Sequence, residues 1–492
     1  MRKLSFPIAL AVAALASGCS LAPHYDRPEA PVSGSYPSGP SYASGAASST
    51  ATPAAELGWR EFLGDPQLQK LVELALQNNR DLRVAVLNVQ ASRAQYRIER
   101  AALFPTINAT AAQSNQRLPL DLSSSPSGYS NSYNVGLSAQ WELDLFGKVQ
   151  SLKNQALYQY LATAQARKAA EILLVSEVAN QYLTLRAADE QLKVTQETLT
   201  TAQESYRLAK IQFDTGTGSE LDLRQAETVI DQAEANYQAQ IRSRAQAENT
   251  LVLLVGQPLP ADLPAPLDLN DQKILADIPA GLPSDLLTRR PDIMEAENTL
   301  RAANANIGAA RAAFFPAITL TASGGSASPT LGGLFKAGTA AWTFAPNLTL
   351  PIFNAGTNEA NLDLAHIQKN IAVAQYEKAI QTAFQEVSDG LAARGTYDAQ
   401  IDALERNTHA NQRTLELSTL RYKSGVDSYL TVLTAQTGLY SAQQTLISTR
   451  LDRLTSLVNL YQYLGGGWVE HTGDQPREAD DPVQHAAPRQ PT

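Results

Sequence analysis

The sequence predicts a mainly α-helical protein that combines long coiled-coil helices with four strands of a transmembrane β-barrel. Three observations predict this fold class. The 492 residues repeat one plan at an offset of about 210, which is too long for a solenoid repeat and indicates a duplicated domain. Each half holds two segments of alternating apolar and polar residues. Each half also holds long helical segments with a heptad pattern.

The N-terminus has the pattern of an exported protein that receives a lipid. A basic start and the apolar run 4–16 form a signal peptide whose core is too short to cross a bilayer comfortably. Its ending, LASGC, resembles the cleavage box of bacterial lipoproteins, so residues 1–18 are expected to be removed and Cys19 to carry a covalent lipid such as palmitate. Ser20 favours sorting to the outer membrane. An ordinary signal peptide that happens to end in a cysteine is the alternative.

Composition narrows the class of protein. The chain has 39 Lys and Arg against 48 Asp and Glu, a net charge of −9, and no basic cluster, so we expect no nucleic-acid partner. Cys19 is the one cysteine, so the fold does not rely on disulfides. Past the signal peptide, no apolar run is long enough to predict a transmembrane helix.

The repeat sets the expected domain boundaries. Residues 19–56 read as a lipidated, extended leader rich in Pro, Ser, Gly and Ala, and the polar tail 469–492 is expected to be disordered. The first repeat covers 57–257 and the second covers 281–468, with the linker 258–280 between them. Each repeat is expected to contain a helix, a β-hairpin and a pair of long helices.

Two pairs of segments carry the duplication. ERAALFPTI (99–107) matches AARAAFFPAI (309–318), and in both a proline ends a helix before a strand. IQFDTGTGSELDLRQAE (211–227) matches LRYKSGVDSYLTVLTAQ (420–436). In each of the second pair, a glycine lies where one long helix is expected to turn into the next.

Alternation predicts a β-hairpin at 105–145 and another at 316–351. In NVGLSAQWELDL (134–145) every second residue is apolar, and WTFAPNLTL (342–350) repeats the pattern with Trp, Phe and Leu. One apolar and one polar face over about ten residues is typical of an outer-membrane strand. A half-buried sheet in a soluble protein alternates in the same way and is the alternative.

The long helices are expected at 149–255 and 357–464. No proline or glycine interrupts the chain from Val149 to Phe213. Apolar side chains fall seven residues apart along this stretch, which predicts a coiled-coil seam: Val178, Leu185, Leu192, Leu199, Tyr206 and Phe213. A second seam, Val432, Leu439, Leu446 and Leu460, is broken by Arg453, and Arg244 marks the matching break in the first half. A solvated coiled coil without a lumen is the alternative.

Strand number bears on assembly. The smallest transmembrane barrels need about eight strands, and open strand edges are not tolerated in lipid. Four strands cannot close alone, so the chain must oligomerise if its strands lie in the membrane. Three copies, for example, would give twelve strands and twelve helical passes.

These segments resemble the TolC-like outer-membrane efflux channels, and specifically their OprM-like lipoprotein branch, over about residues 57–468. The motifs that carry the resemblance are WELDLFGKV (141–149), GLPSDLLTRRPDI (281–293), RYKSGVDSYLTVL (421–433) and LGGGW (464–468). The resemblance implies a homotrimer in the outer membrane with an α-helical barrel in the periplasm and an equatorial belt near 258–280 and the C-terminal region. It also implies a periplasmic membrane-fusion adaptor and an inner-membrane RND pump as partners, with drugs and small toxic molecules as cargo.

The resemblance assigns roles to both helix turns. The tips, which would dock the adaptor, are Gly216, Thr217, Gly218 and Ser219 in the first repeat, and Gly425, Val426, Asp427 and Ser428 in the second. The glycines can close a helix in the left-handed conformation, and Ser219 and Asp427 can cap the next one. Ordinary helix-turn chemistry requires the same residue types and is the alternative.

A periplasmic gate is expected just inside the tips. Asp222 and Tyr422 match gate residues of the family, whereas Thr431 and Thr434 replace family acids, so an intact acidic ring is not expected. Three copies of Asp222 around an axis would attract cations. Glu142 and Asp144 are expected to face the lumen, with plain solvated strand positions as the alternative.

An enzyme is not expected. The five histidines lack metal-ligand spacing, and the chain has neither a phosphate-binding loop nor a nucleophile elbow. No cofactor is expected apart from the lipid on Cys19, and no metal. Two other functions stay open: a channel of the same fold for protein secretion or metal efflux, and a structural coiled-coil lipoprotein without a pore.

Overall fold

A computed structural model describes residues 20–42, 52–117, 119, 121, 128–276 and 278–474. These residues divide into two compact units. The strand unit combines the described residues of Met1–Glu29, Asn88–Thr163 and Glu295–Glu377, and the helix unit combines those of Ala30–Leu87, Ala164–Met294 and Lys378–Thr492. Among the described residues, no helix has both the length and the apolar character needed to cross a membrane.

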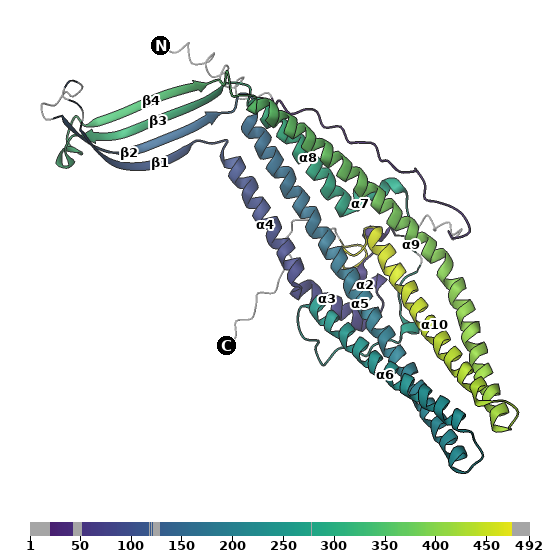
Figure 1. Ribbon diagram of the computed structural model, residues 1–492. Helices are drawn as coiled ribbons and strands as arrows, with labels where there is room; N and C mark the ends of the chain where they lie inside the picture. Colours follow the sequence, from purple (N-terminus) through teal and green to yellow (C-terminus); the bar gives the residue numbers. More distant parts are fainter. Residues whose placement is uncertain are drawn as a thin grey trace. The chain divides into compact units, whose positions relative to one another are not determined.

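The strand unit contains one four-stranded antiparallel sheet with the strand order β1-β2-β3-β4 (Figure 1). Its strands are β1 (Thr106–Arg117), β2 (Tyr129–Leu143), β3 (Ala317–Ser328) and β4 (Ala340–Thr349). Each predicted hairpin therefore forms, and the sheet joins the two repeats through the pairing of β2 with β3. β1 and β4 are left as the edges.

The register gathers the apolar residues of both repeats on one face. Leu143 of β2 and Leu348 of β4 both pair with Ile318 of β3, and residues that pair across strands point to the same side. This apolar face runs along β2 from Val135 to Leu143, about 26 Å of strand, which is close to the length of about 9–11 residues that a tilted transmembrane strand needs. The alternation read from the sequence thus defines one continuous surface.

The opposite, polar face carries hydroxyl and amide side chains. Its paired residues include Asn108 with Ser138, Gln140 with Thr321, and Ser323 with Thr343, whose hydroxyls are 2.7 Å apart. Within the strands, its one charged side chain is Glu142, at the end nearest the helices. A face of this kind is neutral and easily wetted.

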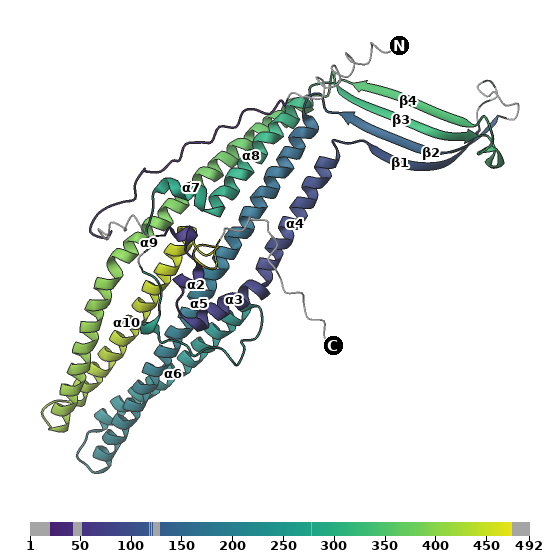
Figure 2. The same ribbon diagram turned by 180° about the vertical axis from the view of Figure 1, so that it is seen from behind.

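Four long helices and several shorter ones make up the rest of the described chain. Helices α3 (Pro66–Asn78), α4 (Arg80–Ala101) and α8 (Pro291–Ala312) precede the strands, and the long helices are α5 (Lys148–Asp214), α6 (Glu220–Val255), α9 (Thr357–Lys423) and α10 (Tyr429–Tyr463). Short turns of helix lie between them: η1 (Ala54–Glu56), α2 (Trp59–Phe62), η2 (Leu269–Asp271), η3 (Pro283–Asp285), α7 (Leu286–Arg289) and η4 (Leu331–Gly333). Figure 2 shows α5 beside α6 and α9 beside α10.

The predicted seams are buried along most of their length. Val178 and Leu185 on α5 are buried, as are Val432 and Leu460 on α10. The α5 seam loses burial toward its C-terminal end, where Phe213 is 39% exposed in the single chain. A straight helix has 3.6 residues per turn, so a seven-residue stripe drifts around it and leaves the interface over many turns.

Each break in a seam is an ion pair. Arg244 on α6 donates to Asp189 on α5 at 2.9 Å, and Arg453 on α10 donates to Asp398 on α9 at 2.5 Å. The two pairs occupy matching positions in the two repeats. A charged contact in an apolar seam costs little at the half-exposed surface and fixes the register of the two helices.

Buried contacts hold the short N-terminal helices and the C-terminal segment of the helix unit in place. Asp65 is buried and caps α3 by accepting from the backbone of Gln67 at 2.8 Å, and it also accepts the hydroxyl of buried Tyr182 at 2.6 Å. Phe62 stacks on Tyr461 with their ring centroids 3.9 Å apart. Trp468 of the closing LGGGW motif is buried with Ile172, so this motif anchors the C-terminal segment on α5.

We predict that Asp65→Ala destabilises the helix unit by about 2–4 kcal/mol. The change removes an N-cap, worth about 1 kcal/mol, and leaves the Tyr182 hydroxyl buried without its acceptor, which costs about 1–3 kcal/mol. Thermal unfolding followed by helical circular dichroism measures the effect as a lower midpoint. Asp262→Ala, at an exposed aspartate beyond α6, is the matched control and is expected to leave the midpoint unchanged. Equal midpoints for both variants would contradict the prediction.

Candidate functional site: the helix tips and the gate

The two predicted tips adopt the same turn. After α5, the backbone N–H of Thr217 donates to the Gln212 carbonyl at 2.8 Å, and after α9 that of Val426 donates to the Arg421 carbonyl at 2.9 Å. The glycine before each donor has a left-handed backbone, with φ of 74° at Gly216 and 71° at Gly425. Both turns therefore close the helix in the way that glycine favours.

The tips differ in how the next helix begins. Ser219 is the N-cap of α6 and accepts from the backbone N–H of Asp222 at 3.1 Å. The N-cap of α10 is Ser428, so the expectation that Asp427 caps this helix was wrong. The reason is a stronger partner: Arg421 binds both carboxylate oxygens of Asp427, at 2.5 and 2.8 Å. These hydrogen bonds from Arg421 hold the pKa of Asp427 below its usual value.

The structure brings two of the predicted gate residues together. Tyr422 donates to the side-chain oxygen of Gln212 at 2.6 Å, which ties the end of α9 to the end of α5. Burial raises the pKa of Tyr422, and the negative charge of nearby Asp222 raises it further. The ring of Tyr422 also packs on that of Tyr429, with centroids 5.2 Å apart.

The predicted threonines lie elsewhere on the same helix. Thr431 and Thr434 are three residues apart on the exposed side of α10, and the Thr434 hydroxyl donates to the Leu430 carbonyl at 3.0 Å. Asp222 is half-buried, and its carboxylate accepts from the Ser219 hydroxyl at 2.8 Å. The cap thus fixes the direction in which the Asp222 carboxylate points.

Gln212 and Tyr429 join the gate network although sequence reasoning missed both. Tyr429 is buried in an apolar cluster that draws on all four long helices, and burial raises its pKa to about 12. Gln212 lies in the segment IQFDTGTGSELDLRQAE, so a residue-by-residue comparison of that segment with its counterpart could have drawn attention to it. Tyr429 could not, because an aromatic residue in the first turn of a helix is more often packing than function.

A cavity of about 440 Å³ lies among the long helices next to this cluster. Its lining combines amide and hydroxyl side chains from all four helices, such as Thr198, Gln232, Gln412 and Gln436, with an apolar floor that includes Leu439. Tight packing resists rearrangement, whereas a polar cavity leaves room for helices to shift. The four long helices therefore enclose a partly polar cavity beside the cluster that holds Tyr429.

Both predicted lumen-facing acids, Glu142 and Asp144, have partners within the chain. Glu142 forms an ion pair with Lys148 at 3.2 Å. β2 ends at Leu143, so Asp144 lies past the strand, where its carboxylate accepts from the backbone N–H of Gln150 at 2.7 Å. Negative charge at a helix N-terminus is favourable, so Asp144 has a structural task at the start of α5.

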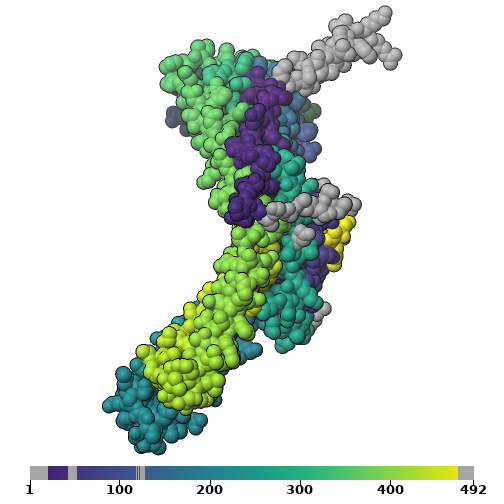
Figure 3. Space-filling view, turned by 90° about the vertical axis from the view of Figure 1, so that its right-hand side faces the viewer, coloured from purple at the N-terminus to yellow at the C-terminus, as the bar shows by residue number. Residues whose placement is uncertain are grey.

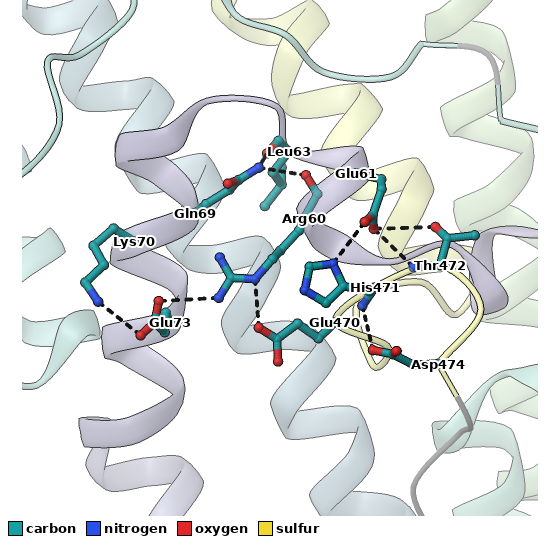
Figure 4. Close-up of polar contacts among 10 residues, drawn as sticks. All are labelled: Arg60, Glu61, Leu63, Gln69, Lys70, Glu73, Glu470, His471, Thr472 and Asp474. Carbon is teal, nitrogen blue, oxygen red and sulfur yellow. Dashed lines mark hydrogen bonds and ion pairs between the residues drawn. The ribbon is translucent and has the colours of Figure 1, made fainter.

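The C-terminal segment is ordered further than the sequence predicts. Residues 469–474 pack on α2, and Figure 4 shows the contacts. Glu61 accepts from the Thr472 backbone at 3.2 Å and lies 3.0 Å from the His471 ring, while Arg60 pairs with Glu470 at 2.7 Å. The expected start of the disordered tail at residue 469 is therefore too early. Residues 475–492 lie outside the described part.

The leader is also held by specific contacts, although Cys19 and the signal peptide lie outside the described residues. Figure 3 shows the described residues 20–42 of the leader in purple. Arg27 binds buried Glu297 of α8 through two hydrogen bonds, at 3.0 and 2.8 Å, and Tyr25 donates to the same carboxylate at 3.2 Å. Burial by itself would raise the pKa of Glu297, but the hydrogen bonds from Arg27 and Arg301 outweigh it and lower the pKa.

We predict that the leader detaches from α8 in Glu297→Ala. The loss of these contacts costs the docked leader about 1–3 kcal/mol. Because the pKa of Glu297 lies below its ordinary value of 4.5, the stabilisation is present above that pH and is lost as pH falls through the lower folded value. Proteinase K trimming of the N-terminus at pH 7, read by mass spectrometry, measures detachment.

The control for this experiment is Glu359→Ala, at an exposed glutamate in the first turn of α9. We expect this variant to be trimmed at the parent rate. If Glu297→Ala is trimmed no faster than the control, the contacts with Glu297 do not hold the leader.

Comparison with known proteins gives consistent matches over nearly the whole chain. The model of the family described as outer membrane efflux protein matches residues 71–257 and 282–466, one match for each repeat. The chain is 53% identical to the toluene efflux pump outer membrane protein TtgC of Pseudomonas putida, over 96% of this chain and 98% of that protein. It is 44% identical to the outer membrane protein OprJ of Pseudomonas aeruginosa, over 96% and 98% of the two chains.

Solved structures agree. The open state of the MtrE outer membrane channel of Neisseria gonorrhoeae matches with a TM-score of 0.82 and 43% identity, over 93% of this chain and all of that one. A membrane protein from Pseudomonas aeruginosa matches with a TM-score of 0.83 and 44% identity, over 92% and 98% of the two chains.

Proposed function

From the premise that this chain belongs to the outer membrane efflux protein family, we propose that it is the exit duct of a tripartite drug and solvent pump. The protein is an outer-membrane efflux channel and not an enzyme. Its fold is that of the trimeric channels among its solved relatives, with four strands per chain, as the sequence predicts. The proposal adds the cargo, the partners, the gate and the lipid anchor.

The observation that carries the proposal is the identity with pump components named for their cargo. Relatives at 53% identity over 96% of this chain are a toluene efflux pump protein and an antibiotic efflux pump protein, both of Pseudomonas putida. Apolar solvents and antibiotics share little chemistry beyond being small and partly apolar. We therefore propose a broad class of small amphipathic and apolar compounds as the cargo of this channel.

The polar face of the sheet suits such a mixed cargo. Its hydroxyl and amide groups are neutral within the strands, apart from Glu142, which is paired with Lys148. A wetted, neutral wall offers neither the apolar surface nor the fixed charge that would hold compounds tightly. A channel stores no energy, so an inner-membrane pump of the RND type is the proposed source of drive and a periplasmic adaptor the proposed link.

We place the adaptor contact at the two tips and the gate just behind them. The tip residues, Gly216–Ser219 and Gly425–Ser428, are mostly exposed, and their backbones are fixed by the helix-closing turns. The gate consists of Asp222 and Tyr422, with Thr431 and Thr434 on the exposed side of α10. The hydrogen bond from Tyr422 to Gln212 would hold the helix pairs together at rest, and an adaptor that displaces the tips would break it.

The lipid on Cys19 is part of the proposal. The cysteine lies at the end of a lipoprotein-like signal, and the leader that follows it is docked on α8 by Tyr25 and Arg27. A lipid chain on this cysteine would add membrane affinity at the start of the leader. Mass spectrometry of the mature N-terminus would detect it.

We predict that deletion of the gene raises the retention of a fluorescent efflux dye in cells with unchanged pump expression. The intact gene is expected to restore the parent level, because the pump cannot discharge its cargo without an outer-membrane exit. Plate-reader fluorescence of dye-loaded cells measures retention. If parent cells, which carry the protein in the outer membrane, retain as much dye as deletion cells, the result would contradict drug efflux. It would favour secretion or a structural role.

We also predict that Asp222→Asn reduces the cation preference of the channel by roughly two-fold or more, because three charges leave the constriction together. Reversal potentials of the purified channel in planar bilayers under a salt gradient measure the preference. Asp231→Asn, at an exposed aspartate further along α6, is the matched control. If both variants keep the parent selectivity, Asp222 does not set the charge of the gate.

A further inference from the structure

An aromatic pair lies where the β-hairpins of the two repeats meet within one chain. Phe146, just past β2, stacks on Phe315, just before β3, with ring centroids 4.7 Å apart and planes 21° from parallel. The strands that these rings flank, β2 and β3, are paired along their length. The stack therefore marks the point where the end of one repeat meets the start of the next.

The duplication supplies the same two rings a second time, but leaves them apart. LDLF (143–146) matches LPIF (350–353), so Phe353 corresponds to Phe146, and LFP (103–105) matches FFP (314–316), so Phe104 corresponds to Phe315. Phe353 is 89% exposed and Phe104 is 62% exposed. They flank β4 and β1, the two edges of the sheet.

We propose that Phe353 stacks on Phe104 of a second copy of this chain, so that the contact within the chain is repeated between chains. In a trimer, three clamps within chains would alternate with three clamps between them. A second copy of the chain is the expected partner, because the equivalent pair of rings, Phe146 and Phe315, already stacks within the chain. The two extra residues before α9, Asn354 and Ala355, follow Phe353 and do not change its distance from β4.

The repeat also predicts the register between copies. The match of Phe146 with Phe353 moves a β2 residue 207 positions on to β4, and the match of Phe315 with Phe104 moves a β3 residue 211 positions back to β1. Applied to the pair Trp141 and Leu320, these shifts place Leu348 opposite Ala109 of the next copy.

This register also places apolar-face residues opposite one another, although the faces were not used to derive it. Ala109 pairs with Leu137 of β2, so it lies on the apolar face, as Leu348 does through Ile318. A shift of one residue would place Leu348 opposite a polar-face residue instead. Two matches taken from different parts of the sequence therefore give one continuous apolar face around the assembly.

Helix α9 carries a second uncovered surface in the strand unit. Leu364, Ile367 and Ile371 are spaced three and four residues apart, which places them on one face of the helix, and all three are exposed. An exposed apolar stripe of this kind is typical of an interface with another copy. The clamp thus continues a contact surface that extends beyond the sheet.

Cysteine cross-linking in outer-membrane vesicles tests the clamp. The variant Phe104→Cys/Phe353→Cys, treated with a short bismaleimide and run on a denaturing gel, is expected to shift from monomer to covalent dimers and trimers. The matched control, Phe146→Cys/Phe315→Cys, is expected to link within the chain and stay at monomer mass. The parent, whose one cysteine is Cys19, sets the background.

A second pair tests the register. Ala109→Cys/Leu348→Cys is expected to link between copies, whereas Thr110→Cys/Leu348→Cys is expected not to, because Thr110 points to the polar face. If the Phe104→Cys/Phe353→Cys variant stays monomeric while this pair links, the clamp is wrong and lipid covers Phe353. If neither links, the register is wrong as well.

Loss of both rings could keep the double variant out of the membrane. Co-expression of a Phe104→Cys chain with a Phe353→Cys chain then tests the same contact, because each copy loses one ring. A covalent dimer that needs both chains supports the clamp, and its absence overturns it. None of these outcomes depends on cargo or pump, so they are independent of the proposed transport function.

Discussion

The unpaired edges of the sheet are the constraint on which the rest of the structure depends. β1 and β4 are the edges of the sheet among the described residues, so each presents backbone groups along one side that no other described strand pairs, and lipid offers no hydrogen bonds to replace them. The apolar face identifies the sheet as lipid-facing, so the edges must be paired by other copies. Oligomerisation is therefore a condition for the sheet to exist in the membrane, whatever is transported through it.

The duplication allows one kind of contact to meet this condition. In a chain whose two halves carry the same residues at their strand edges, the same strand pairing can form once inside the chain and once between chains. The paired ion pairs Arg244–Asp189 and Arg453–Asp398 show that the helices follow the same logic, with one register lock in each repeat. The sheet, the seams and the tips are thus built twice from one design.

How far sequence reasoning reaches depends on how local the cause is. Alternation, heptads and turn glycines act over a few residues, so the strands, the long helices and the tips could all be predicted. The choice of Ser428 over Asp427 as N-cap could not, because it depends on Arg421 reaching across the turn. The leader contact with Glu297 joins residues 270 apart in the chain, and no periodic pattern encodes such a partner.

The residues of the proposed gate differ in chemistry between the two repeats. Asp222 in one repeat corresponds to Thr431 in the other, and Gln212 corresponds to Arg421. Gln212 has a side-chain carbonyl oxygen that accepts the Tyr422 hydroxyl from the other helix pair, whereas Arg421 can only donate and is held by Asp427 within its own tip. One tip therefore reaches across and the other closes on itself, and a trimer would present six tips of two alternating kinds. Any partner that binds all six must therefore recognise both kinds of tip, and in the proposed function the contact from Tyr422 to Gln212 is the one that would hold the helix pairs closed.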